Sequence, residues 1–268
     1  MKFTRPSRRA TRFALPLAGA AAALAMAGSA AQAAPAVNPD PIPATFDFSD
    51  CPTLPAGSDL HASTCVSVVV TSGTFHLGKF DQAIEKPIKM TFANAYNPET
   101  FQFTSVFGKM HAEKMLVQPG LFGDPLLSAV YAQPEFAGVF DQPTSADFKI
   151  KMGLKVRLVN PILGSNCLIG SDSNPILLDL TTGTTAPPAP NTPITGEKAT
   201  VVRTTPPPTV RSAKHVDNAF SVPGAKGCLF GGGVADWLVN QVGGMPSAGG
   251  KNTMVFNEYM STQAYDKL

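Results

Sequence analysis

Four basic side chains form the densest group of chemistry-bearing residues in the sequence. Lys149, Lys151, Lys155 and Arg157 occupy odd-numbered positions of one short segment. A period of two places side chains on one face of a β-strand, with next-but-one residues about 6.6 Å apart. This row could form a positive band that binds an anionic cell-envelope polymer or lipid headgroups. The other interpretation is a solvated face that acidic residues of neighbouring strands balance.

The sequence also contains four cysteines, Cys51, Cys65, Cys167 and Cys228. In an exported chain an even number of cysteines indicates disulfides, and four cysteines allow three pairings. We expect Cys51 to pair with Cys65, which closes a short loop, and Cys167 to pair with Cys228, which closes a longer one. The chain-entropy model assigns at most about 3 and about 4 kcal/mol to loops of these lengths. A four-thiolate zinc site is the alternative, but it lacks paired cysteines two residues apart.

The histidines do not form a recognisable metal-binding motif. His111 with Glu113, and His215 with Asp217, are spaced to share a strand face, but each pair supplies only two ligands. We therefore expect solvated or hydrogen-bonded surface roles for these histidines. We predict no metal and no cofactor.

Catalytic motifs are missing as well. The sequence has no Gly-x-Ser-x-Gly nucleophile elbow, and glycines 231–233 lack the following lysine of a phosphate-binding loop. Asp124, Glu135, Asp141 and Asp147 could supply a glycosidase pair only if the fold brought two of them together. We assign no catalytic residues and predict a non-catalytic binding protein. The alternative is an extracellular hydrolase whose site assembles only in three dimensions.

Residues 1–33 have the organisation of a secretory signal peptide. Five basic residues precede an apolar stretch, and Ala31-Gln32-Ala33 is a small-residue cleavage site. We expect cleavage after Ala33 and a secreted or cell-envelope location. An uncleaved membrane anchor is less favoured, because this alanine-rich segment is marginal for spanning about 30 Å of hydrocarbon.

Signal cleavage changes the charge of the protein. The whole chain has 21 basic and 19 acidic residues, and loss of the five basic residues in 1–33 leaves 16 basic and 19 acidic residues, a formal net charge of −3. A mildly acidic protein offers no global electrostatic attraction for nucleic acid. We therefore predict no nucleic-acid partner.

The composition indicates an all-β fold. The 25 prolines and 23 glycines argue against long helices. The clearest strand is Phe148–Leu158, in which every even position is apolar. A hairpin is expected to turn at Thr71–Gly73. The one convincing helix is Val234–Val242, with Trp237 expected as a core residue.

We expect one antiparallel β-sandwich-like domain with this short helix near the carboxyl end. It should cover residues 46–268, after the signal peptide and a proline-rich leader at 34–45. A proline- and threonine-rich loop at 184–210 lies inside the domain, with a strand around Val201 and Val202.

Three segments carry a resemblance to a known family. Residues 48–55 read FSDCPTLP, residues 158–171 read LVNPILGSNCLIGS, and residues 246–252 read PSAGGKN. With these motifs the chain resembles a family of uncharacterised exported proteins of actinobacteria over most of its mature part. The resemblance implies a secreted or envelope-associated β protein with paired cysteines, and it implies no activity or site residues.

Overall fold

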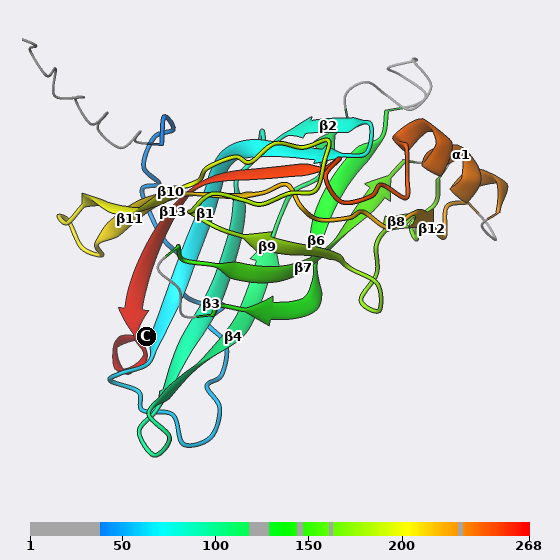
Figure 1. Ribbon diagram of the computed structural model, residues 1–268. Coiled ribbons are helices and arrows are strands. Elements are labelled where there is room, and N and C mark those ends of the chain that lie inside the picture. Colours follow the sequence, from blue (N-terminus) through cyan, green and yellow to red (C-terminus); the bar gives the residue numbers. More distant parts are fainter. Residues whose placement is uncertain (1–37, 118–128, 144–146, 161–162, 230–232) are drawn as a thin grey trace, which may run out of the picture. The chain divides into compact units, whose positions relative to one another are not determined.

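The described part of the chain forms two antiparallel β-sheets that pack face to face (Figure 1). The computed structural model describes residues 38–117, 129–143, 147–160, 163–229 and 233–268. The expected all-β, sandwich-like fold with one short helix is confirmed. The predicted signal peptide and its cleavage site lie outside the described residues. No helix within the described ranges is long and apolar enough to cross a membrane.

The larger sheet has seven strands within the described ranges. They are β1 (Thr64–Leu77), β2 (Phe80–Ala83), β3 (Ile88–Asn97), β4 (Gln102–His111), β10 (Glu197–Arg203), β11 (Val210–Asp217) and β13 (Thr253–Ala264). Their hydrogen-bonded order is β10-β11-β13-β1-β3-β4, and β2 pairs with the carboxyl end of β1. The predicted strand around Val201 is therefore the edge strand β10.

The smaller sheet has six strands in the same part of the chain. They are β5 (Met115–Leu116), β6 (Tyr131–Asp141), β7 (Ile150–Val159), β8 (Leu168–Ile169), β9 (Ile176–Leu180) and β12 (Ala225–Lys226). Their order is β12-β8-β7-β6-β5, and β9 pairs with the first half of β7. The strand predicted from the two-residue period is thus the central strand β7.

Apolar side chains on the inner faces of both sheets form one core. Every second residue of β7 from Ile150 to Leu158 is buried, because a strand with this period turns one set of side chains inward. Between the layers Phe107 stacks on Phe136 with ring centroids 3.8 Å apart, and Phe92 contacts Phe140 at 5.1 Å. Burial of these rings joins the two sheets.

The hairpin expected at Thr71–Gly73 is wrong, because β1 runs through this segment as one continuous strand. Pairing with β13 shifts register between Val70 and Ser72, which leaves Thr71 as a β-bulge. Gly73 follows with φ +145°, and a Cβ there would lie 1.9 Å from the carbonyl oxygen of Val255. The glycine therefore permits close approach of β13 and does not make a turn.

The predicted helix is confirmed as α1 (Val234–Gly243), which ends at Gly244 in the left-handed conformation. Its predicted buried face is wrong: Trp237 is 60% exposed and Val234 is 80% exposed. Polar side chains dock the helix instead. Asp236 accepts the backbone N–H of Cys228 at 2.7 Å, and Asn240 accepts the N–H of Ala225 at 2.7 Å.

Residues 38–55, which we call the N-terminal strap, pack on the outer face of the larger sheet. A disulfide joins Cys51 of the strap to Cys65 of β1. The hydroxyl of Tyr259 on β13 donates to the carbonyl oxygens of Asn38 and Asp40, at 3.2 and 2.6 Å. The described part of the proline-rich leader, residues 38–45, thus contacts the sheet.

Candidate functional site

The structure places the predicted basic row next to acidic residues of flanking segments. Lys155 Nζ lies 2.6 Å from Asp172 Oδ1. The guanidinium of Arg157 donates to both carboxylate oxygens of Glu135, at 2.6 and 3.1 Å, and this hydrogen bond raises the pKa of Arg157. Lys155 and Arg157 are therefore engaged in ion pairs.

Lys151 lies near acids as well. Exposed Lys151 on β7 is in register with Asp141 of β6 and Asp179 of β9. Lys149 precedes β7 by one residue. The three residues Lys151, Lys155 and Arg157 lie beside carboxylates, which is the arrangement of a solvated face with balanced charge.

Both expected disulfides are confirmed. The Cα atoms of Cys51 and Cys65 are 5.9 Å apart, and those of Cys167 and Cys228 are 4.1 Å apart. No cysteine of the described chain remains free to ligate zinc. Two disulfides indicate an oxidising compartment such as the extracellular space.

Each of the four histidines pairs with a carboxylate. The pairs are His61 with Asp266, His76 with Asp81, His111 with Asp50 and His215 with Glu258. The two pairs considered from sequence do not form, because Glu113 binds Lys86 and Asp217 accepts the N–H of Asp179. In the described ranges no three metal-binding side chains come together.

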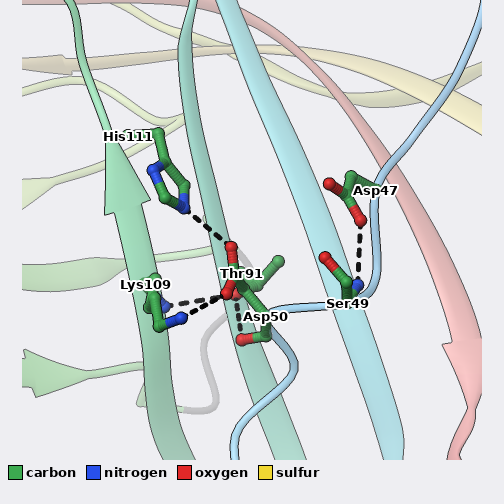
Figure 2. Close-up of polar contacts among 6 residues, drawn as sticks. All are labelled: Asp47, Ser49, Asp50, Thr91, Lys109 and His111. Atoms are coloured by element: carbon green, nitrogen blue, oxygen red, sulfur yellow. Dashed lines mark hydrogen bonds and ion pairs between the residues drawn. The ribbon is translucent and has the colours of Figure 1, made fainter.

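The most concentrated polar cluster joins the N-terminal strap to β3 and β4, and we call it the clasp (Figure 2). It consists of Asp50, Thr91, Lys109 and His111. Asp50 Oδ1 accepts from Lys109 Nζ at 2.6 Å, and Asp50 Oδ2 lies 2.7 Å from His111 Nε2. The hydroxyl of Thr91 donates to the carbonyl oxygen of Asp50 at 2.6 Å. The clasp therefore fixes both the side chain and the backbone of Asp50.

A β-bulge in β4 creates the clasp. The register of β3 and β4 shifts opposite Thr91, so that Gly108 and Lys109 together oppose one residue. Lys109 and His111 are two residues apart and share one face of β4. The extra residue turns that face toward the strap, whereas strict alternation from the core-facing Phe107 would have pointed both side chains into the core. Gly108 leaves room for the strap, because a Cβ there would lie 2.4 Å from the carbonyl oxygen of Asp50. Sequence reasoning missed the clasp because a bulge has no signal in residue spacing.

The interactions of the clasp hold the N-terminal strap on the sheet. Hydrogen bonds from Lys109 and then from His111 lower the pKa of Asp50, so its carboxylate stays ionised. Among the described residues, the Thr91 hydroxyl donates to the backbone of Asp50, and His111 pairs with the Asp50 carboxylate. The cavity beside the clasp measures about 40 Å³, which is space on the scale of water molecules.

A second charged pair lies inside the molecule. His215 on β11 is fully buried, with Nδ1 at 2.8 Å from Glu258 Oε1 and Nε2 at 2.8 Å from the carbonyl oxygen of Phe148. Burial alone would lower the pKa of His215, but the Glu258 carboxylate and these hydrogen bonds raise it above its ordinary value. The surface role expected for His215 is therefore wrong. Through its hydrogen bond to the carbonyl oxygen of Phe148, His215 links the larger sheet to the segment that leads into β7.

A hollow lies between the two sheets at the amino end of β1, and we call it the cleft. On the inner face of the larger sheet, three successive rows of cross-strand neighbours change from apolar to polar to aromatic. From the core outward, the rows are Val66–Phe92–Phe107, Thr64–Asn94–Ser105 and, on β3 and β4, Tyr96–Phe103. The apolar core thus gives way to a polar row and then to an aromatic rim.

The opposite wall of the cleft comes from the smaller sheet. Asp141 ends β6, Gln142 and Pro143 follow it, and Phe148 precedes β7. Phe148 has φ +40°, a left-handed conformation that a phenylalanine rarely adopts, and its carbonyl is held by His215. The cleft measures about 670 Å³, within the range of about 300 to 1,000 Å³ that small-molecule sites occupy.

The polar side chains of the cleft leave their hydrogen-bonding capacity unused. Within the described ranges, the side chains of Thr64, Asn94, Ser105 and Gln142 make no hydrogen bond to the protein. The Oε1 atom of Gln142 is itself buried without a partner. The four side chains are half-buried and their free groups face one hollow, while the buried Oε1 atom of Gln142 lacks the partner that buried polar atoms nearly always have. The hollow therefore offers a place for a ligand or water.

The carboxylates considered for glycosidase chemistry do not face one another as a pair. Glu135 is held by Arg157, and Asp147 lies 3.6 Å from Lys198. Asp141 lines the cleft as its one charged residue in the described part, and Asp124 lies outside the described residues. Among the three described carboxylates, Glu135 and Asp147 are thus each engaged by a cation, and only Asp141 lines the cleft.

Comparison of the chain with protein-family models, with curated proteins and with solved structures finds no match.

Proposed function

We propose that this protein is an exported, non-catalytic binding protein of the extracellular space or cell envelope, and that its ligand binds in the cleft. Two disulfides and the signal-peptide pattern support export. The observation that carries the binding role is a cleft of about 670 Å³ whose polar side chains have no partner in the described protein.

The cleft replaces the basic row as the proposed binding site. Lys155 and Arg157 already hold carboxylates at 2.6 Å, so an anionic polymer would have to displace those partners. The cleft needs no such rearrangement, because its hydrogen-bonding groups are unoccupied by protein. A preformed site binds with a smaller ordering cost than one that must first be opened.

The test fills the cleft with a large side chain. Ser105→Trp places an indole in the polar row of β4, and aromatic residues are well accepted in strands. Val201→Trp is the matched control, because Val201 is an exposed strand residue on the far edge of the same sheet and does not line the cleft. Both variants should keep the wild-type circular dichroism spectrum and both disulfides.

The measurement is co-sedimentation of each purified protein with the insoluble envelope fraction of the producing cells. We expect the wild-type protein and Val201→Trp to sediment with this fraction and Ser105→Trp to stay in the supernatant. Failure of the wild-type protein to bind the fraction, or equal binding by folded Ser105→Trp, would overturn the proposal.

A further inference from the structure

We infer that the ligand of the cleft is a neutral carbohydrate chain, an inference that rests on the proposed binding function. Three properties of the cleft carry it: the sign of its charge, the kind of its hydrogen-bonding groups and the position of its aromatic rings. Each can be argued from the described residues that line it.

The charge of the cleft disfavours an anionic ligand. Among the described residues that line it, Asp141 is the one charged side chain, and no lysine, arginine or histidine is present. A phosphate or carboxylate group bound there would meet a carboxylate and no cation, which is unfavourable. A neutral ligand avoids this repulsion, and its hydroxyl groups can donate to Asp141.

The hydrogen-bonding groups match a ligand that both donates and accepts. Hydroxyls of Thr64 and Ser105 and the amides of Asn94 and Gln142 each supply donors and acceptors. Thr64, Asn94 and Ser105 are cross-strand neighbours on adjacent strands, so they repeat at about the 4.8 Å spacing of a sheet. A polyhydroxylated chain presents hydroxyl groups of both kinds along its length, and such a periodic row can contact several of them.

The aromatic rings lie where the faces of sugar rings would stack. Phe103 is 63% exposed at the rim, and its ring is packed against Tyr96 with centroids 5.0 Å apart. Phe148 lines the other wall. The C–H face of a pyranose or furanose ring is apolar and packs on such a ring, while its hydroxyl edges point to polar groups. The polar row beside an aromatic rim therefore fits both parts of a sugar.

The first experiment identifies the ligand class. The wild-type protein is run in native gels that contain a neutral glucan, mannan, galactan or arabinan, the acidic polysaccharide polygalacturonate, or the cationic polysaccharide chitosan. We expect at least one neutral polysaccharide to retard the protein, and we expect added salt to leave the retardation unchanged, since screening weakens only charge-driven binding. Retardation by no neutral polysaccharide, or only by an acidic or cationic one, would overturn the inference.

The second experiment locates the binding. Titration calorimetry with the retarding polysaccharide compares Asn94→Ala and Phe103→Ala with Phe101→Ala, because Phe101 is 78% exposed nearby but does not line the cleft. We expect about tenfold weaker binding for each of the first two variants, the effect of one hydrogen bond or one aromatic contact. Phe101→Ala should bind like the wild-type protein. Equal losses for all three variants would contradict this location.

The two proposals fail in different ways. If Ser105→Trp abolishes binding to the envelope fraction but no neutral polysaccharide binds or competes, the cleft remains the binding site and the carbohydrate inference is wrong. If Ser105→Trp binds the envelope fraction like the wild-type protein, the cleft is not the site and both proposals are wrong.

Discussion

At the scale of single residues, the buried pair of His215 and Glu258 should make stability depend on pH. The pKa of His215 is raised in the folded protein, so protonated His215 stabilises the fold fully below its unfolded pKa of about 6.5. This contribution is lost as the pH rises through the folded pKa. Breaking one partner of a buried pair costs about 3–5 kcal/mol. We therefore expect Glu258→Gln to lower the free energy of unfolding by about this amount at pH 6.

Urea unfolding from pH 5.5 to pH 9 measures this effect. The difference between the wild-type protein and Glu258→Gln should shrink as the pH rises, because the wild-type protein alone loses the contribution of the ion pair. Glu113→Gln is the control, since Glu113 is an exposed glutamate paired with Lys86, and it should follow the wild-type curve. A difference that is constant with pH would show that His215 is not protonated in the folded protein.

A second prediction at this scale concerns the exposure of Trp237. As the only tryptophan of the chain it reports alone in fluorescence, and its side chain is 60% exposed on α1. We expect red-shifted emission that acrylamide quenches efficiently in the folded protein. Trp237→Ala should change the free energy of unfolding by less than about 1 kcal/mol, because surface substitutions rarely matter more. Blue-shifted, poorly quenched emission would place the indole in a core.

At the scale of elements, the clasp depends on the space that Gly108 leaves for the N-terminal strap. A Cβ at this position would lie 2.4 Å from both the carbonyl oxygen of Asp50 and the hydroxyl oxygen of Thr91. We expect Gly108→Ala to push the strap from the sheet and to lower the free energy of unfolding by about 1–3 kcal/mol, the usual cost of overpacking. Hydrogen exchange should rise in residues 38–55 while β7 keeps its protection. Uniform acceleration in both segments, or none, would contradict the role of the clasp.

The same elements show what a sequence can and cannot predict here. The strand at Ile150–Val159 and the end of α1 at Gly244 were predictable, because a two-residue period and a terminal glycine are local signals. The turn at Thr71–Gly73 was predicted wrongly because a β-bulge and a turn share small, polar residues. The exposed face of α1 was missed because Asp236 and Asn240 set its orientation through contacts with residues 225–228. The residues of the cleft and of the clasp come from several strands that are distant in sequence, so no local sequence pattern predicts them.

At the scale of the whole molecule, two disulfides restrain different lengths of chain. Cys51 and Cys65 are 14 residues apart, whereas Cys167 and Cys228 are 61 apart. Because longer loops lose more entropy on closure, removal of the first disulfide should cost about 3 kcal/mol and removal of the second about 4 kcal/mol. Urea unfolding of the two double cysteine-to-alanine variants measures both values. A larger loss from the shorter loop would mean that the N-terminal strap contributes more than chain entropy.

Export remains the prediction that connects the disulfides, the charge and the proposed ligand. If the signal peptide is removed after Ala33, the mature chain begins at Ala34 and carries a formal net charge of −3. Intact mass spectrometry of the native protein should then give the mass of residues 34–268 less the four hydrogens lost in two disulfides. Retention of Met1, or reduced thiols in the native protein, would contradict export. A chain that stays in a reducing compartment could not form its disulfides, and a cleft for envelope carbohydrate would have no ligand there.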